Sequence, residues 1–298
     1  MNHIAFLGVG NMGAGMAANL AKAQRPVTAY DLSPQALARA EAAGCSTAGS
    51  AAEAVRDADA VITMLPAGEH VRAVYEAQVI PNAKAGALLI DCSTIDVESA
   101  RHVAAQAAAA GFAFADAPVS GGTMAADAGT LAFMVGCADA DFARVEETLK
   151  PMARVVLHAG GAGAGQAAKI CNNMVLGVSM LGVCEAFALA EKLGLAPERF
   201  FEIAGQSSGQ CWSLTNYCPW PGPVPAAPSN RGYEGGFLTR LMLKDLKLAQ
   251  EAAAKSGAAT PLGAQAEAMY ALFDRLGYGG KDFSAVLQLM RGRLDELA

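Results

Sequence analysis

The glycine-rich turn GVGNMG near the start of the chain constrains the fold more than any other feature. The apolar run HIAFLGV (3–9) precedes it and the small-residue stretch MGAGMAANLAKA (12–23) follows it, a pattern that predicts a buried strand and then a helix. In such a turn Gly8 permits the bend, Gly10 lets a ligand approach the backbone, and Gly13 lets the helix pack on the strand. Because a helix N-terminus attracts anions, the turn predicts a site for the pyrophosphate of a dinucleotide.

An acidic residue ends the second predicted strand, PVTAYD (26–31). Asp31 follows Gly13 by eighteen residues, and no arginine stands among the next few residues. A carboxylate at this place accepts a hydrogen bond from the ribose 2′-hydroxyl and repels a 2′-phosphate. The sequence therefore predicts NAD rather than NADP. The simpler alternative is a structural glycine turn followed by a surface aspartate at the next helix.

The rest of the first half alternates between apolar runs and helical stretches. This alternation is typical of a parallel sheet that helices cover on both faces, and it predicts a doubly wound α/β domain over residues 1–162. Further strands are expected at 60–66, 87–93, 112–120, 131–136 and 154–160, with helices at 34–44, 70–77 and 97–111.

The pattern becomes helical from residue 163 onward, which predicts an all-α domain over 163–298. Its first segment runs for about 30 residues without a breaker, suited to one long helix that joins the two domains. The stretch 217–236 holds five of the thirteen prolines and is predicted to be a loop. Further helices are expected at 197–206, 237–256, 261–276 and 282–292.

Composition excludes several classes of function. The net charge is −6 and there is no Lys/Arg-rich run, so binding to nucleic acid is not expected. No apolar run is expected to span a bilayer, and the N-terminal residues do not resemble a secretion signal, so a cytoplasmic protein is predicted. The seven cysteines form no CxxC pair, which argues against a metal site and a disulfide framework.

A lysine stands in apolar surroundings within the predicted long helix. In GAGQAAKICNNM (163–174), Lys169 and Asn173 are four residues apart and therefore lie on one helix face. Lysine is almost never fully buried without a partner or a task, which makes Lys169 a candidate catalytic residue. A solvated lysine at a helix edge remains the alternative.

An ordered series of motifs covers nearly the whole chain. With these motifs the chain resembles the β-hydroxyacid dehydrogenases, and the last three resemble the branch that acts on 3-hydroxyisobutyrate. The motifs are GVGNMGAGMAANL (8–20), MLP (64–66), DCSTI (91–95), DAPVSGGTMAADAGTLAFMVG (116–136), GAGQAAKICNNM (163–174), SSGQCW (207–212), YCPWPGPVP (217–225) and GGFLTRLMLKDLKLAQ (235–250).

The resemblance implies NAD-dependent oxidation of 3-hydroxyisobutyrate to methylmalonate semialdehyde, a step of valine breakdown. It implies that Lys169 is the general acid/base, with a pKa below its usual 10.4 because of burial and a cationic nicotinamide ring. It implies that Asn173 orients the substrate and that Trp212 and Tyr217 line its pocket.

Two further groups of residues receive roles from the resemblance. The segment Ser120, Gly121, Gly122 would bind the substrate carboxylate through exposed backbone N–H groups, although such a segment alone is also an ordinary turn. The residues expected to bind the cofactor are Gly8, Gly10, Asn11, Met12, Gly13 and Asp31, and by resemblance Leu65, Pro66, Ser93, Thr94, Phe237 and Lys244.

Other functions remain open. A sister enzyme would act on a serine-like substrate, on tartronate semialdehyde or on a short ω-semialdehyde. A non-catalytic NAD(H) sensor is less favoured, because it needs neither Lys169 nor Asn173. 6-Phosphogluconate dehydrogenase shares the glycine turn, but basic residues for a phosphate are not evident here. A homodimer or homotetramer is expected, with no metal.

Overall fold

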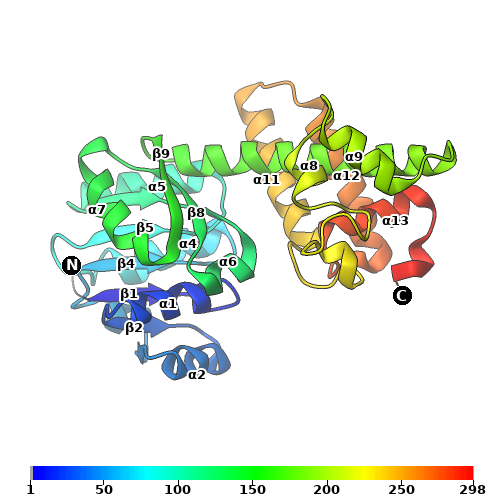
Figure 1. Cartoon of the computed structure of the whole chain (residues 1–298). Coiled ribbons are helices and arrows are strands. Elements are labelled where there is room, and N and C mark those ends of the chain that lie inside the picture. Colours follow the sequence, from blue (N-terminus) through cyan, green and yellow to red (C-terminus); the bar gives the residue numbers. More distant parts are fainter. Residues whose placement is uncertain (1–2, 298) are drawn as a thin grey trace. The chain divides into compact units, whose positions relative to one another are not determined.

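The computed structural model describes residues 3–297 and contains two compact units (Figure 1). The first unit ends at Lys169 and the second begins at Ile170. Residues 1, 2 and 298, which the predicted domain bounds include, lie outside the described residues. The fold class predicted from the sequence, a Rossmann-type sheet followed by a long helix and an all-α region, is confirmed.

The first unit is built on one twisted sheet. Its strand order is β3-β2-β1-β4-β5-β6-β8-β7, with β9 paired to β8. The strands are β1 (Ile4–Leu7), β2 (Val27–Tyr30), β3 (Ser46–Thr47), β4 (Ala60–Thr63), β5 (Leu88–Asp91), β6 (Ala113–Asp116), β7 (Val119–Ser120), β8 (Leu131–Gly136) and β9 (Ala153–Gly160).

The expectation of a purely parallel sheet is wrong at one edge. From β3 to β6 every pair is parallel, but β8 runs antiparallel to both β6 and β7. Only residues 121–130 connect β7 to β8. A parallel crossover needs a dozen residues or more, so the chain returns antiparallel instead. The predicted strand 112–120 is divided into β6 and β7 at Ala117 and Pro118.

Helices cover both faces of the sheet (Figure 1). Along β1, Ile4 and Phe6 contribute to one buried cluster, whereas Ala5 and Leu7 contribute to a second one on the opposite face. The first cluster includes side chains of α1 (Gly13–Lys22), α2 (Pro34–Ala42), α6 (Gly122–Ala128) and α7 (Asp139–Leu149), and the second those of α3 (Ala51–Val55), α4 (Gly68–Val74) and α5 (Val97–Ala109).

The second unit is helical. One apolar core, which includes Phe187, Met242, Tyr270 and Phe283, holds its helices together. The predicted loop 217–236 is irregular apart from a short 3₁₀ turn at Pro228–Arg231. The helices are α8 (Ala164–Lys192), whose first turns belong to the first unit, α9 (Pro197–Gly205), α10 (Trp212–Thr215), α11 (Thr239–Ser256), α12 (Pro261–Phe273) and α13 (Val286–Arg291).

The long helix α8 contradicts the prediction that no apolar run is long enough to span a bilayer. It is 29 residues long, and its length and composition alone would let it cross a membrane, contrary to the expectation that no run does so. Alanine, glycine and apolar side chains outweigh the few polar residues scattered along it. A single helix of this kind is weak evidence, because a core helix meets the same criterion. Met180, Cys184 and Phe187 of α8 are indeed core residues.

Candidate functional site

The glycine turn after β1 has the geometry that its residue pattern predicts. Gly8 has φ +92°, and a Cβ there would collide with the backbone oxygen of Met64. A Cβ at Gly13 would collide with the backbone of Gly8. At Gly10, in contrast, no heavy atom of residues 3–297 other than those of Gly10 and its two chain neighbours lies within 4 Å of where a Cβ would be. Gly8 and Gly13 therefore build the turn, and Gly10 leaves its outer side open to a ligand.

The N-terminus of α1 suits a diphosphate. Among the described residues no side chain caps this helix, and its first turn carries no acidic residue. The first N–H groups of a helix have no partner within the helix, and they favour an anion. Asp31 directly follows β2, is partly exposed, and accepts a hydrogen bond from Ser33 N at 2.8 Å. The turn, the helix and the carboxylate together fit NAD.

Ser93 ties together the ends of two neighbouring strands. Its hydroxyl donates to Asp91 Oδ1 at 2.6 Å and accepts a hydrogen bond from Leu65 N at 2.8 Å. Thr63 donates to the same Asp91 oxygen at 2.7 Å. Ser93 is completely buried, whereas Thr94 is partly exposed. Ser93 and Thr94 are both predicted to meet the cofactor. The Ser93 side chain is used to hold together the loops after β4 and β5.

The start of α8 is hydrogen-bonded to residues at the carboxyl ends of the sheet strands. Asp116, at the end of β6, accepts hydrogen bonds from Gly163 N at 2.7 Å and from Gln166 N at 2.8 Å. The Gln166 amide donates to Ser93 O at 2.7 Å and accepts from Ile95 N at 3.1 Å. Burial raises the pKa of Asp116 to about 6.

Sequence reasoning assigned no role to Asp116 or Gln166. Both lie in quoted motifs, and each is a polar residue beside an apolar run. That signal does not distinguish a structural hydrogen bond from a catalytic contact.

The segment predicted to bind a carboxylate requires its glycines. Gly121 has φ +133° and Gly122 has φ +68°, a region that other residues rarely adopt. α6 begins at Gly122 and is held against α1 by Asn19, whose amide donates to Ala126 O at 2.7 Å. The sequence predictions did not include Asn19. Its hydrogen bond links α1 to α6, the helix that begins at Gly122.

Lys169 and Asn173 lie one turn apart on α8, as their spacing predicts. Lys169 is only 6% exposed, which excludes the alternative of a solvated lysine at a helix edge. Asn173 is buried and donates to Asp245 Oδ2. Asp245, on α11, follows the predicted cofactor residue Lys244, which is partly exposed. Sequence reasoning had not paired Asn173 with Asp245.

Trp212, at the start of α10, belongs to an aromatic group of the second unit together with the loop residues Tyr217 and Phe237. The Trp212 ring is stacked on Tyr217 with centroids 4.9 Å apart, and half of Trp212 is exposed. The Tyr217 hydroxyl donates to Asp282 Oδ2 at 2.7 Å, and Phe237 N donates to the same oxygen at 2.8 Å. Asp282 is fully buried. It organises two predicted site residues, and sequence reasoning missed it.

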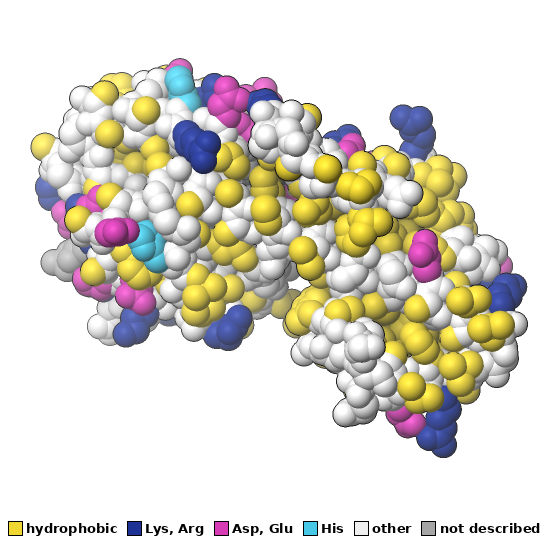
Figure 2. All heavy atoms as spheres, turned by 90° about the horizontal axis from the view of Figure 1, so that it is seen from above, with side chains coloured by type: hydrophobic (Ala, Val, Ile, Leu, Met, Phe, Trp, Pro, Cys, Tyr) yellow, Lys and Arg dark blue, Asp and Glu magenta, His cyan; other side chains and the backbone are white. Residues whose placement is uncertain are grey.

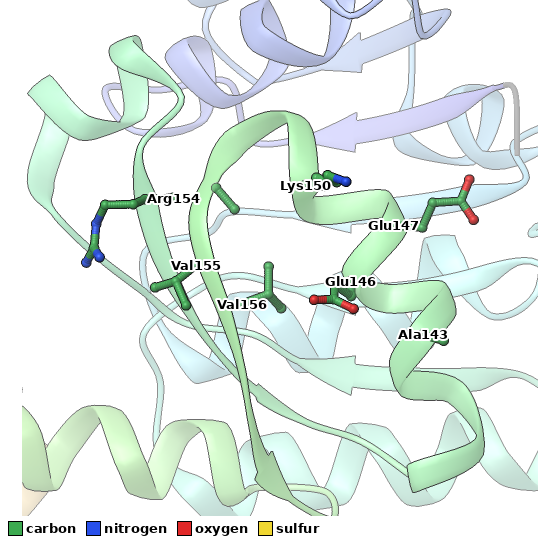
Figure 3. Close-up of a pocket in the computed structure, with 8 residues that line it drawn as sticks. Ala143, Glu146, Glu147, Lys150, Arg154, Val155 and Val156 are labelled. Carbon is green, nitrogen blue, oxygen red and sulfur yellow. The ribbon is translucent and has the colours of Figure 1, made fainter.

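A surface hollow of about 500 Å³ is lined by residues of the first unit (Figure 3). Its described lining residues belong to α7, β9 and the short turn between them, and none of them is a predicted site residue. Glu146, Glu147, Lys150 and Arg154 give it a mixed charge. This hollow therefore does not bring the candidate residues together.

Two family models together match nearly the whole chain. Residues 3–161 match the NAD binding domain of 6-phosphogluconate dehydrogenase. Residues 163–290 match the model described as the NAD-binding domain of NADP-dependent 3-hydroxyisobutyrate dehydrogenase. Asp31 bears on the choice between the two cofactors, because it suits a free ribose 2′-hydroxyl.

Curated relatives are similar over full length. A protein of Mycobacterium tuberculosis (strain ATCC 25618 / H37Rv) named probable 3-hydroxyisobutyrate dehydrogenase is 50% identical, over 99% of this chain and 100% of its own. The chain belongs to the 3-hydroxyisobutyrate dehydrogenase family. It is an NAD-dependent oxidoreductase of that family, with NAD as its cofactor.

One more curated relative and one solved structure are also similar to this chain over nearly their full length. A Pseudomonas aeruginosa protein named NAD-dependent L-serine dehydrogenase is 47% identical, over 97% of this chain and 98% of its own. The solved structure of the M. tuberculosis 3-hydroxyisobutyrate dehydrogenase with L-serine is 49% identical, with a TM-score of 0.95 over 98% of this chain and 99% of that one.

Proposed function

We propose that this chain oxidises 3-hydroxyisobutyrate to methylmalonate semialdehyde with NAD, as a step of valine breakdown, and that Lys169 is its general acid/base. The observation that carries the proposal is the buried lysine one helical turn beyond Gln166, whose amide binds the backbone beside Thr94. Full-length relatives with this name at about 50% identity support the substrate.

The first unit supplies the proposed cofactor contacts. The glycine turn and the α1 N-terminus would hold the diphosphate, and Asp31 would hold the adenosine ribose. Leu65 and Pro66 would lie beside the adenosine, and Thr94 beside the nicotinamide ribose. Of the remaining predicted contacts, Asn11 and Met12 belong to the turn, and Phe237 and Lys244 belong to the second unit.

The proposed reaction divides into hydride and proton transfer. The bound NAD supplies the acceptor for the hydride that leaves the alcohol carbon. Lys169 Nζ takes the hydroxyl proton as the carbonyl forms, and it returns a proton in the reverse direction. A buried lysine is suited to this work, because burial disfavours its charged form. Asn173 would orient the substrate, and Ser120–Gly122 would bind its carboxylate through backbone N–H groups.

L-Serine is the second candidate substrate. It has a primary hydroxyl on the β-carbon and a carboxylate, as 3-hydroxyisobutyrate has. A relative at 47% identity is named for its oxidation, and a structure at 49% identity was solved with it. A buried Lys169 would serve both substrates, so discrimination falls to the groups around the α-carbon substituent.

A substrate panel tests the reaction. Formation of NADH or NADPH is followed by absorbance with 3-hydroxyisobutyrate, L-serine, D-glycerate and 4-hydroxybutyrate, each with NAD and with NADP. We expect the highest kcat/KM with 3-hydroxyisobutyrate and NAD. A higher kcat/KM with L-serine would reassign the substrate. Binding of NADH without turnover of any acid would favour a sensor and overturn the proposal.

Replacing Lys169 tests its role. In Lys169→Met, which keeps most of the side-chain volume, we expect kcat to fall by about 10²–10⁴-fold, the usual contribution of a general acid/base. NADH binding, followed by fluorescence, should stay near that of the wild type. Lys192→Ala, an exposed lysine at the other end of α8, is the matched control. Wild-type kcat in Lys169→Met would refute the assignment.

We further propose a homodimer or homotetramer that works in the cytoplasm. Of thirteen large apolar side chains exposed within residues 3–297, ten belong to the second unit. Figure 2 shows hydrophobic side chains of all sizes gathered on the surface of the helical unit. An odd number of cysteines without a CxxC pair is common in reducing compartments. Sedimentation and cell fractionation test the two statements.

A further inference from the structure

A continuous chain of hydrogen bonds connects the carboxyl ends of three strands with the first turn of α8. It starts at the loop after β4, where Leu65 N donates to the Ser93 hydroxyl, and it passes to the loop after β5. The Gln166 amide then joins that loop to α8, and Asp116 at the end of β6 holds the backbone of Gln166 itself. All of these residues belong to the first unit.

We propose that Gln166 is a positioning residue that holds Thr94 at a fixed distance from Lys169. The proposal rests on the function proposed above, in which Thr94 meets the nicotinamide ribose and Lys169 moves the proton. Gln166 donates to the carbonyl of Ser93 and accepts from the N–H of Ile95, so it binds the backbone on both sides of Thr94.

The chemistry of the amide explains why glutamine is present. The two groups flanking Thr94 are one acceptor and one donor, and they lie in residues that are 0% and 1% exposed. A primary amide offers one oxygen acceptor and an N–H donor in a fixed planar arrangement. Without Gln166 a buried carbonyl and a buried N–H would both lose their partner. Thr94 between them is partly exposed.

The same residue is fixed relative to the lysine. Gln166 and Lys169 are three residues apart on α8 and so lie on neighbouring positions of one helix. Asp116 accepts from the backbone of Gln166, which limits any slide of this turn. A displacement of about 1 Å at a reacting centre costs about 100-fold in rate. The network therefore sets the distance between Thr94, the proposed contact of the nicotinamide ribose, and Lys169, the proposed acid/base.

Two substitutions at Gln166 test this role. Gln166→Leu fills the space but removes both hydrogen bonds. Gln166→Glu keeps the acceptor for Ile95 N, but its ionised carboxylate faces the Ser93 carbonyl and cannot donate to it. We expect kcat to fall by about 10–100-fold in both at neutral pH, together with weaker NADH binding. Val145→Ala, at a buried position of α7, controls for a general loss of stability.

The pH dependence is the decisive readout. As the pH falls, the carboxyl group of Gln166→Glu takes up a proton, and burial favours this neutral form. The protonated group then donates to the Ser93 carbonyl and restores both hydrogen bonds. We therefore expect kcat of Gln166→Glu relative to the wild type to rise from neutral to mildly acidic pH, while the same ratio for Gln166→Leu stays flat.

Three results overturn the inference. One is a kcat within twofold of the wild type in both variants, the second is a flat pH ratio for Gln166→Glu, and the third is an equal loss in Val145→Ala. Lys169→Met, measured in parallel, separates this inference from the proposed function. If Lys169→Met is active, the proposed function is refuted. If Lys169→Met is inactive and Gln166→Leu has the kcat of the wild type, only the positioning role is refuted. If Gln166→Leu does not fold, the pH ratio of Gln166→Glu decides alone.

Discussion

Two buried carboxylates, one in each unit, hold predicted site residues of their own unit in different ways. Asp116 and Asp282 are both fully buried, and burial raises the pKa of each. Asp116 accepts hydrogen bonds from backbone N–H groups at the start of α8. Asp282 accepts from two hydroxyl groups and two backbone N–H groups, those of Tyr217, Phe237 and Ser284.

The difference shows what each carboxylate fixes. Asp116 sets the start of a helix, and its surroundings contain glycines because there is no room for a side chain: a Cβ at Gly136 or Gly165 would collide with Asp116 or its neighbours. Asp282 fixes side chains in a loop that has little regular structure of its own. Both units therefore use a buried carboxylate, but Asp116 binds only backbone N–H groups, whereas Asp282 binds side-chain hydroxyl groups as well.

Removing Asp282 should have the largest effect on stability. In Asp282→Ala the Tyr217 hydroxyl, Phe237 N and the Ser284 groups lose their shared acceptor, and we expect a loss of about 3–5 kcal/mol in the free energy of unfolding. Trp212 and Trp220 both belong to the second unit, so denaturation followed by tryptophan fluorescence measures it.

Tyr217→Phe sharpens this first prediction. It removes one donor from Asp282 and leaves the others, so the expected loss is only about 1 kcal/mol. A loss in Asp282→Ala no greater than that in Tyr217→Phe would show that the backbone donors find other partners. The loop would then not depend on the carboxylate.

The titration of Asp116 should produce the next largest effect. Its pKa is about 6 in the fold, against about 3.9 in an unfolded chain. A raised carboxyl pKa means that the folded state keeps its proton longer, so this contribution to stability is complete below about pH 4 and is lost as the pH rises through about 6. We expect the wild type to lose about 3 kcal/mol relative to Asp116→Asn between these limits.

Chemical denaturation of both proteins at a series of pH values measures this difference. The asparagine variant does not titrate at this position, so the pH dependence of the difference isolates Asp116. If the wild type instead gains stability relative to the variant as the pH rises, the two N–H donors at the helix start outweigh the cost of burying the charge.

The smallest predicted effect compares two glycines of α8. A Cβ at Gly165 would collide with the backbone oxygen of Met134, which cannot move aside, so Gly165→Ala should cost about 1–3 kcal/mol and lower activity. At Gly182, apart from its chain neighbours and the adjoining backbone of α8, no heavy atom of the described chain lies within 4 Å of a new Cβ. Gly182→Ala should therefore stabilise the protein by about 0.5–1 kcal/mol. Equal effects in thermal unfolding would contradict this difference in packing.

The parts of the fold that sequence could predict are those with a short-range signal. The strand, glycine turn and helix at residues 3–23 follow one another along the chain, and Lys169 and Asn173 are one helical turn apart. In each case the spacing of the residues along the chain is enough to predict how they lie relative to one another. The helices α3, α6 and α7 were not predicted, because their runs are short or interrupted by acidic residues and glycine.

The supporting partners could not be predicted, because each lies far along the chain. Gln166 binds a loop 71–73 residues away, and Asp282 binds Tyr217 across 65 residues. Nothing in the residue pattern pairs Asn173 with Asp245. The antiparallel return of β8 depends on connection length, which the pattern of apolar runs did not reveal.

The hydrogen bonds of Gln166 have a consequence for the redesign of this enzyme. They recognise main-chain groups of Ser93 and Ile95, so they impose no requirement on which side chain stands at position 94. The backbone support around position 94 therefore does not depend, through these two hydrogen bonds, on which residue stands there. Exchanging Thr94 leaves both Gln166 hydrogen bonds available, whereas exchanging Ser93 removes a hydroxyl that is itself part of the support.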